Sequence, residues 1–267
     1  MDLFLSGKRA LVTGSNRGTG AVIAATLARE GARVAVHGNA PGEQDAIALE
    51  IEHAGGSAIA VTGDITTDAG AELIDAAVTD AFGGIDVLVN NFGQATGGGW
   101  DDPTTPGFLR AYEINTLSAV RMIAAFVPGM RERRFGRVIQ IATIGTTRPG
   151  PRMPEYYAAK AALANLGVSL SKELAGTGVT VNTVSPGLIH TREMESYFRS
   201  LAERHGWGDS WPEIEEKGVH KLTGTRAGRM AKPEEVADLV AFLASECAGY
   251  MTGGNFRVDG GATETVQ

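Results

Sequence analysis

The stretch Thr13–Gly14–Ser15–Asn16–Arg17–Gly18–Thr19–Gly20 decides how the rest of the sequence is interpreted. It follows an apolar, strand-like run, Ala10–Thr13, and precedes a helix-like run, Ala21–Arg29. Glycines at such a junction let the backbone turn tightly and approach a pyrophosphate, which the N-terminus of the next helix stabilises. The spacing is Gly-x-x-x-Gly-x-Gly and differs from the general Gly-x-Gly-x-x-Gly fingerprint. Glycines also serve ordinary turns, so its place between the first strand and the first helix is what favours a phosphate-binding loop.

Outward from this loop, short β-branched runs alternate with longer Ala-rich helical runs. The predicted strands are Ala10–Thr13, Arg33–Val36, Ala58–Val61, Asp86–Val89, Arg137–Ile141, Thr180–Val184 and Phe256–Val258. The predicted helices are Ala21–Arg29, Gln44–His53, Gly70–Phe82, Leu109–Arg133, Tyr156–Leu174 and Glu234–Ala244. Strands that alternate with helices predict parallel strands joined by right-handed crossovers. The pattern predicts an α/β fold, a Rossmann-type doubly wound parallel sheet of about seven strands with helices on both faces.

Length and composition fit a single domain over residues 1–267. Hydrophobic residues make up 43% of the chain and charged residues 21%, enough for one large buried core. The net charge of −7 disfavours a nucleic-acid surface, because phosphate binding needs a basic patch. No apolar run approaches the ~20 residues of a membrane span, and residues 1–8 are too short and mixed for a signal peptide. We therefore expect a cytoplasmic protein without membrane or nucleic-acid partners.

The chain has one cysteine, Cys247, which excludes an intrachain disulfide and fits a reducing compartment. It lies in the apolar run Val240–Ala248, where we expect a small buried filler. We predict no metal site.

A second stretch, Pro154–Glu155–Tyr156–Tyr157–Ala158–Ala159–Lys160, carries the candidate chemistry. Its four-residue spacing puts Tyr156 and Lys160 on the same helix face, whereas Tyr157 is rotated by roughly 100°. A phenol titrates near ~10, and an ammonium one turn away is expected to lower that pKa, which suits general acid–base catalysis. The alternative is an exposed Tyr and Lys that merely share a helix face, because so short a motif needs structural context.

Taken together, the glycine-rich loop and the Tyr156/Lys160 pair make the chain resemble the classical short-chain dehydrogenases/reductases over nearly its full length. Residues 13–20 look like that family's Thr-Gly-x-x-x-Gly-x-Gly cofactor loop. The resemblance implies reversible hydride transfer between nicotinamide and a ketone or secondary alcohol, similar to β-ketoacyl carrier-protein reductases. It makes Tyr156 the general acid in reduction and the base in oxidation. Lys160 would lower the pKa of Tyr156 and bind the nicotinamide ribose.

The same resemblance assigns further catalytic residues and shows two departures. Thr143 stands where the family usually has Ser in a Ser-Ser pair; its hydroxyl would polarise the carbonyl, while its methyl restricts the rotamer and crowds the substrate. Asn115 matches the family's helix Asn, which holds a water in the proton path; a polar surface residue is the alternative. Phe92 replaces Ala in the family's Asn-Asn-Ala-Gly segment, here Asn90–Gly93, and its bulk is expected to alter packing near the adenosine pocket.

Cofactor contacts also follow from the resemblance. Asp64 matches the acid that contacts adenine, with a helix-capping Asp as an equal alternative. In the segment Ser185–Thr191 the backbone of Ile189 and the hydroxyl of Thr191 would hold the nicotinamide carboxamide, and we expect His190 to be structural. The predicted cofactor-binding residues are Gly14, Asn16, Arg17, Gly18, Thr19, Gly20, His37, Gly38, Asp64, Ile65, Asn91, Gly93, Tyr156, Lys160, Pro186, Gly187, Ile189 and Thr191.

The end of the second strand bears on the choice between NADP and NAD. An acid there binds the ribose hydroxyls and repels a phosphate, whereas a basic residue accepts the 2′-phosphate. Gly38 stands where NAD-specific members carry Asp, so no carboxylate repels the phosphate from that position. Arg17 resembles the basic residue of NADP-dependent members, and a guanidinium pairs bidentately with phosphate. A solvated loop charge without selectivity is the alternative for Arg17. These residues favour NADP.

The segment 192–229 stands where the family places its substrate-covering helices, so we predict a lid there. Trp207 and Trp211 either line an apolar pocket or anchor the lid on the sheet. By resemblance we also expect a small-molecule substrate and a homotetramer or homodimer. The predicted helices Leu109–Arg133 and Tyr156–Leu174 are the candidates for the subunit contact.

Three alternatives stay open at this point. One is an NAD-dependent alcohol dehydrogenase. Another is a non-catalytic dinucleotide-binding module, in which the changes at Thr143 and Phe92 mark decay, although intact Asn115, Tyr156 and Lys160 argue against it. The third is an enzyme of the same fold with different chemistry, a dehydratase or an epimerase, which usually shows the extended cofactor-loop pattern.

Overall fold

A computed structural model describes residues 1–95, 98–222 and 224–265 of the chain. Within that part, seven parallel strands form one sheet in the order β3-β2-β1-β4-β5-β6-β7, as the alternating pattern predicts. The strands are β1 (Arg9–Val12), β2 (Arg33–Gly38), β3 (Ser57–Thr62), β4 (Val87–Asn90), β5 (Gly136–Ile141), β6 (Val179–Pro186) and β7 (Asn255–Val258).

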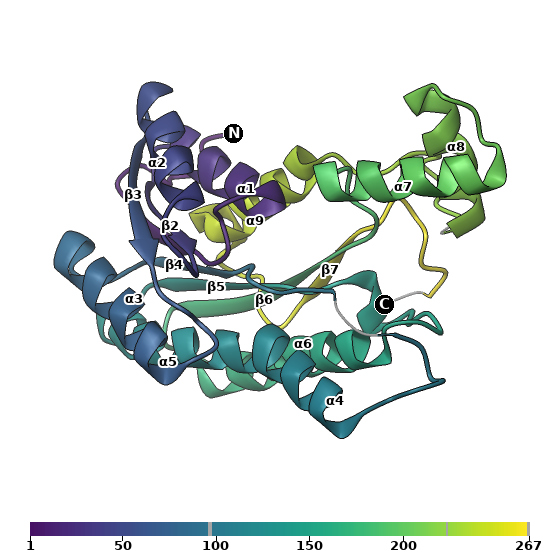
Figure 1. Ribbon diagram of the computed structural model, residues 1–267. Helices are drawn as coiled ribbons and strands as arrows, with labels where there is room; N and C mark the ends of the chain where they lie inside the picture. The colour runs from purple at the N-terminus through teal and green to yellow at the C-terminus, as the bar shows by residue number, and fades with distance from the viewer. Residues whose placement is uncertain (96–97, 223, 266–267) are drawn as a thin grey trace.

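Helices cover both faces of this sheet (Figure 1). The α-helices are α1 (Gly18–Arg29), α2 (Glu43–His53), α3 (Asp68–Phe82), α4 (Thr105–Tyr112), α5 (Ser118–Arg133), α6 (Pro154–Glu173), α7 (Arg192–His205), α8 (Trp211–Leu222) and α9 (Pro233–Ala244). A π-helical turn, η1 (Glu113–Leu117), joins α4 to α5, and η2 (Ile144–Thr146) and η3 (Glu246–Ala248) are short 3-10 turns. The predicted doubly wound fold class is confirmed.

Two hydrophobic cores hold the helices on the sheet, because successive side chains of a strand point to opposite faces. Val12 of β1 packs in the core under α1 and α9, whereas its neighbour Leu11 packs in the core under α3 and α5. Strands buried on both faces need apolar residues at nearly every position, which explains their continuous apolar runs. The order of the strands reverses between β1 and β4, so the carboxyl ends of these two strands open a crevice for a ligand.

The predicted helical stretch Leu109–Arg133 is confirmed, although the helix begins earlier, at Thr105, and the π-helical turn η1 widens it in the middle. Inside this turn the Asn115 amide donates to the carbonyl of Ala111, at 3.0 Å, and Ser118 Oγ donates to the carbonyl of Ile114, at 2.6 Å. Side chains that take these carbonyls compete with the regular helical bonds and favour a locally wider turn. Such π-helical turns are frequent at functional sites.

The prediction that Cys247 is a buried filler is also wrong. The helix α9 ends at Ala244, so Cys247 falls in the following turn η3 and is exposed, with Sγ 3.4 Å from the carbonyl oxygen of Asp2.

The segment predicted as a lid folds into α7 and α8, which stand away from the sheet at one end of the molecule (Figure 1). Residue 223 of this segment lies outside the described residues. The two helices have a hydrophobic cluster of their own, built around Phe198, Trp207 and Ile214. No helix among the described residues is both long enough and apolar enough to cross a bilayer.

Candidate active site

A cleft of about 180 Å³ lies at the carboxyl edge of the sheet, where β1, β4, β5 and β6 end. It brings together predicted residues from five separate segments of the chain. They are Thr19, Asn91, Gly93, Thr143, Tyr156, Lys160, Pro186, Gly187 and Ile189, with Gln94, Ala95, Ile141 and Ala142 completing the walls. The remaining predicted residues are not among those that line this cleft.

Lys160 is buried on α6, with only 3% of its surface exposed. Its Nζ donates a hydrogen bond to the carbonyl oxygen of Ile141, at 2.8 Å. Burial disfavours the charged form and lowers the pKa of Lys160 to about 8. The alternative in which an exposed lysine merely shares a helix face with Tyr156 is therefore excluded.

Tyr156 stands one turn before Lys160 and points into the same cleft. Burial is the main cause that raises its pKa, to about 12; the neighbouring Tyr157 raises it further, and a hydrogen bond with Thr143 lowers it. The expectation of a lowered pKa is thus wrong, because the cost of burying a phenolate outweighs the stabilisation by the hydrogen bond with Thr143. Tyr156 keeps its proton at neutral pH, which is the form that a general acid needs.

Thr143 follows Ala142 after the end of β5 and caps the turn η2. Its Oγ1 accepts a hydrogen bond from the backbone N–H of Gly145, at 3.3 Å, and its hydroxyl also bonds Tyr156. The ring of Tyr157 covers Gly145, where an added Cβ would stand 2.1 Å from Cδ1 of that ring. Tyr157 therefore packs on η2 and, unlike Tyr156, does not line the cleft, in agreement with its rotation on the helix.

Asn115 is buried within η1, so its alternative as a polar surface residue is excluded. Its Oδ1 accepts from the backbone N–H of Gln94, at 3.0 Å, and its Nδ2 donates to the Gln94 carbonyl, at 3.1 Å. A Cβ at Gly93 would stand 2.7 Å from both Asn115 Oδ1 and Lys160 Nζ. Only glycine lets the chain after β4 pass this close to both groups. Sequence reasoning did not assign Gln94 a part in holding Asn115.

The glycine-rich loop between β1 and α1 has the form that a dinucleotide requires. Gly18 adopts a φ of +56°, and no heavy atom of the described residues lies within 4 Å of where its Cβ would stand. On the inner side, Asn91 Nδ2 donates to the carbonyls of Thr13 and Gly14, both at 2.9 Å, and fixes the loop to the end of β4. The open face lies at the N-terminus of α1, where backbone N–H groups favour a pyrophosphate.

His37 lies buried beneath this loop. Its Nδ1 accepts from the N–H of Gly14, at 3.0 Å, and its Nε2 is 2.9 Å from the carbonyl oxygen of Gly63, so the ring is neutral with the proton on Nε2. Burial lowers its pKa. The ring of Phe92 stands edge-on to His37, with centroids 6.5 Å apart, and covers Gly14. His37 and Phe92 therefore both pack against the loop at Gly14, whereas the sequence predicted a contact between His37 and the cofactor.

Asp64 is exposed beyond the end of β3, beside the loop. Its Oδ1 accepts from the Thr66 hydroxyl, at 2.7 Å, from Thr66 N–H, at 3.0 Å, and from Asn39 Nδ2, at 3.1 Å. The bond from the Thr66 hydroxyl is the main cause that lowers the pKa of Asp64. The alternative of a helix cap is wrong, because Thr67 caps α3. The adjacent Ile65 is buried in the core, with only 1% of its surface exposed.

Arg17 is exposed at the outer end of the loop, as a 2′-phosphate ligand requires. Its Nη1 lies 3.7 Å from Glu43 Oε2, and its Nε lies 4.0 Å from Glu193 Oε1 at the start of α7. Asn16 Nδ2 donates to Glu43 Oε2 as well, at 2.5 Å. Sequence reasoning missed this carboxylate, because Glu43 opens α2 and reaches Arg17 only through the fold.

The segment after β6 connects the cleft to the lid. Gly187 passes close to Asp259, since an added Cβ would stand 3.1 Å from Asp259 Cα. Thr191 Oγ1 accepts from Met194 N–H, at 3.3 Å, and caps α7. His190 stacks on Trp211 of α8 with centroids 4.6 Å apart, which agrees with a structural role.

His190 is held from a second side, where its Nε2 lies 3.2 Å from Glu195 Oε2 of α7. Trp207 is buried in the cluster of the lid, so both tryptophans hold the lid together. Neither of them is among the residues that line the cleft.

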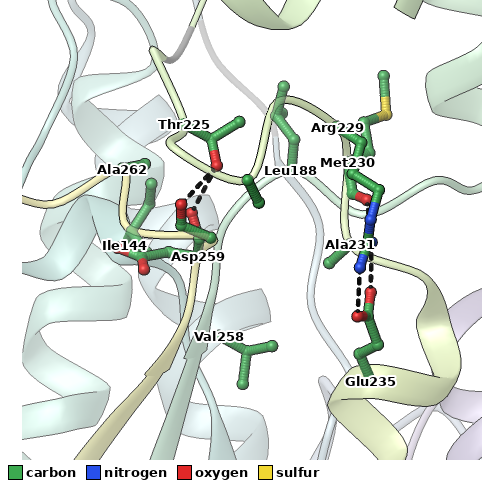
Figure 2. Close-up of a pocket in the computed structure, with 12 residues that line it drawn as sticks. Ile144, Leu188, Thr225, Arg229, Met230, Ala231, Glu235, Val258, Asp259 and Ala262 are labelled. Carbon is green, nitrogen blue, oxygen red and sulfur yellow. Dashed lines mark hydrogen bonds and ion pairs between the residues drawn. The ribbon is translucent and has the colours of Figure 1, made fainter.

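A second, smaller cavity of about 80 Å³ lies where the lid returns to the sheet (Figure 2). Thr225 Oγ1 donates to the carbonyl of Gly260, at 2.9 Å, in the turn after β7. Arg229 forms a bidentate ion pair with Glu235 of α9, both bonds being 2.7 Å. A backbone bridge joins Ile189 to Ala231. Contacts at both ends of the segment 192–229 thus join it to the rest of the chain.

Among the described residues, no group of three or more His, Cys, Asp or Glu side chains is arranged to hold a metal ion. The donors around the cleft are hydroxyls, amides, one buried amine and backbone groups. This set of groups fits a nicotinamide dinucleotide, which supplies a hydride when it is bound.

Comparison with known proteins places this site in a family. A family model described as enoyl-(acyl carrier protein) reductase matches residues 14–263. The 3-oxoacyl-(acyl-carrier-protein) reductase FabG of Vibrio cholerae is 35% identical over 257 residues, which cover 96% of this chain and 98% of that protein.

Two solved structures are also similar over almost the whole chain. L-Sorbose reductase from Gluconobacter frateurii, complexed with NADPH and L-sorbose, has a TM-score of 0.93 and 31% identity, with 100% of both chains covered. A 3-oxoacyl (acyl-carrier-protein) reductase from Agrobacterium tumefaciens C58 with NADP bound has a TM-score of 0.86 and 35% identity, covering 97% of this chain and 96% of that one.

These relatives agree with the predicted preference for NADP, and they favour an enzyme over a non-catalytic binding module. The chain is an NAD(P)-dependent oxidoreductase of the class that acts on CH–OH and C=O groups. It belongs to the classical short-chain dehydrogenases/reductases, the family that its Thr13–Gly20 loop and its Tyr156/Lys160 pair resemble.

Proposed function

We propose that the protein reduces a ketone of a small-molecule substrate to a secondary alcohol with NADPH as the hydride donor. The observation that carries this proposal is the single cleft shared by Tyr156, Thr143 and Lys160 with the predicted cofactor segments at Gly93 and Gly187. The bound cofactor would supply a hydride to the carbonyl carbon, and the Tyr156 hydroxyl would donate its proton to the carbonyl oxygen, which gives the secondary alcohol.

Each catalytic residue has one task in this reaction. Tyr156 holds the proton that it donates, since its pKa lies near 12. Thr143 already bonds the Tyr156 hydroxyl and would direct its own hydroxyl to the same carbonyl oxygen. Lys160 would bind the nicotinamide ribose, and Asn115 would hold the water that returns a proton to the phenolate. In the reverse direction Tyr156 would act as the base.

The cofactor would lie along the carboxyl ends of β1, β4 and β6. The open face at Gly18 would hold the pyrophosphate, and Arg17 would pair with the 2′-phosphate. Asp64 would contact the adenine ring. At the other end, the backbone of Ile189 and the hydroxyl of Thr191 would hold the carboxamide. The lid over 192–229 would cover the substrate once it is bound.

We further propose a homotetramer or homodimer in the cytoplasm. Large apolar side chains on α4 and α6 remain exposed in the single chain, namely Leu109, Tyr112 and Val168. Exposed apolar groups on these two neighbouring helices support a subunit contact there.

Turnover of ketones tests this function. The purified protein is mixed with NADPH and, in turn, a β-ketoacyl thioester, a ketohexose and a simple aliphatic ketone, while NADPH absorbance is followed. We expect one of these classes to consume NADPH and to yield the secondary alcohol in equal amount. NADPH binding without turnover of any class contradicts the proposal in favour of a binding module. Product formed without any change in NADPH indicates a dehydratase or an epimerase.

A further inference from the structure

Gln44 lies across the residue position that bears on coenzyme choice. Gly38 is the last residue of β2, and a Cβ added there would stand 2.5 Å from Oε1 and 3.0 Å from Cδ of Gln44. Gln44 belongs to the first turn of α2 and is fully buried. The space beside Gly38, into which the side chain of an NAD-type Asp would extend, is therefore filled by the end of another side chain.

Hydrogen bonding holds Gln44 in this place. Its Nε2 donates to Thr62 Oγ1, at 2.6 Å, and Thr62 is the residue of β3 that pairs with Gly38 in the sheet. The side chain thus reaches from α2 over the end of β2 to β3. Asn16 closes the other side, with its Cβ 3.4 Å from the same point above Gly38. Moving Gln44 aside would break its bond to Thr62 and expose a buried side chain.

The amide oxygen of Gln44 also disfavours a carboxylate at position 38, in addition to the volume of the side chain. Its Oε1 is buried and has no hydrogen-bond partner among the described residues. An amide oxygen is an acceptor, as is each oxygen of a carboxylate. A carboxylate at position 38 would therefore face a second acceptor in a buried place, which raises the free energy of the charged form.

We propose that Gln44 keeps position 38 of this enzyme free of a carboxylate, because its buried side chain occupies the space that an aspartate there would need. With glycine there, no negative charge at this position opposes the 2′-phosphate of NADP. Gln44 acts through position 38 and does not itself touch the cofactor. The proposal rests on the use of NADP by this chain and is independent of which ketone is reduced.

Coenzyme binding in a double-mutant cycle tests the proposal. The variants are G38D, Q44A and G38D/Q44A, and the measured quantities are the dissociation constants of NADPH and NADH from quenching of tryptophan fluorescence. We expect G38D alone to weaken NADPH binding and to gain little affinity for NADH. Adding Q44A to G38D should then tighten NADH binding about tenfold, whereas Q44A alone should change it less than about twofold.

A matched control separates volume from polarity. Met is close in size to Gln and has no amide, so G38D/Q44M should bind NADH like G38D if volume decides, and more tightly if the unpartnered oxygen also contributes. The proposal is overturned if G38D alone binds NADH as tightly as G38D/Q44A. It is also overturned if Q44A changes NADH affinity by the same factor in both backgrounds.

Unfolding by urea tests the steric contact without any ligand and covers the case in which G38D does not fold. Gly38→Ala should lower the urea midpoint in the native background, and Q44A should reverse part of that loss in the G38A background. Additive effects of the two substitutions would contradict the contact. Failure of the wild type to bind either coenzyme would instead refute the proposed function, and the urea cycle would still decide whether Gln44 restricts position 38.

Discussion

The Nζ of Lys160 donates to the carbonyl oxygen of Ile141 at 2.8 Å, so the cation of the active site is held inside the protein against the end of β5. One carbonyl does not replace the hydration that burial removes, and the pKa of Lys160 falls to about 8. The site therefore contains a buried charge that reduces the stability of the fold.

We predict that Lys160→Met abolishes turnover and stabilises the protein at pH 7. A pKa of about 8 against the ordinary 10.5 corresponds to about 3 kcal/mol, and the lost bond to Ile141 offsets about half of it. The free energy of unfolding should therefore rise by about 1–2 kcal/mol.

The difference in unfolding free energy between Lys160→Met and the wild type should depend on pH. Between pH 8 and 10.5 the unfolded chain binds more protons than the folded one, so the wild type gains stability across this window and the advantage of the variant disappears. Urea unfolding at pH 7 and at pH 10 measures this, with the exposed Lys172→Met of the same helix as control. An equal advantage at both pH values would contradict a charged, buried Lys160.

Tyr156→Phe should retain the fold and NADPH binding while losing most turnover. The phenyl ring keeps the packing and removes the proton that the carbonyl oxygen needs, so kcat should fall by about 10²–10⁴. Stopped-flow reduction and a separate NADPH titration distinguish these effects. Activity near that of the wild type would remove Tyr156 from the role of general acid. Tyr157→Phe is the matched control, because that ring packs on Gly145.

Thr143→Ser should remain active, and Thr143→Val should not. Serine keeps the hydroxyl that bonds Tyr156, and its smaller side chain should widen the range of accepted ketones. Valine has the same shape as threonine without the hydroxyl, so its kcat should fall by about 10²–10³. Steady-state kinetics on two ketones of different size measure both effects. Equal activity of the Ser and Val variants would show that the hydroxyl takes no part.

Glu43→Gln should tighten NADPH binding. Its carboxylate lies 3.7 Å from Arg17 and competes with the 2′-phosphate for that guanidinium. Because the pair is exposed, the gain should be only about two- to fivefold, and it should shrink as salt is added. NADH titration is the internal control, since its affinity should not change, and Arg17→Ala should remove the preference for NADPH. Weaker NADPH binding in Glu43→Gln would mean that Glu43 positions Arg17 rather than competing for it.

Thr225→Val should weaken the attachment of the C-terminal end of the predicted lid segment to the turn after β7. The hydroxyl bonds the carbonyls of Asp259 and Gly260 beside the small cavity of Figure 2, and valine keeps its shape without these bonds. We expect a loss of about 1–2 kcal/mol in unfolding free energy and a higher KM with little change in kcat. If the KM and the protease sensitivity of α7 and α8 are both unchanged in Thr225→Val, the bonds of Thr225 do not hold the lid in place.

Local patterns in the sequence determined the fold. Strand and helix runs, the loop Thr13–Gly20 and the Tyr156/Lys160 spacing depend on residues close in the chain, so periodicity and turn chemistry were enough to predict the doubly wound sheet. The same patterns placed Thr143, Gly93 and Gly187 after successive strands, and parallel strands carry such positions to one edge.

Contacts between distant segments were decided only by the tertiary structure. The placement of the Asn115 side chain depends on Gln94, the exposure of Cys247 depends on where α9 ends, and the filling of the space at Gly38 depends on Gln44 of the following helix. The pKa of Tyr156 is raised, whereas the sequence predicted that it would be lowered, because burial in the folded protein is the main cause of the shift. Spacing along the chain shows which charge is near, whereas desolvation is set by everything that packs around a group, and that becomes known only when the chain is folded.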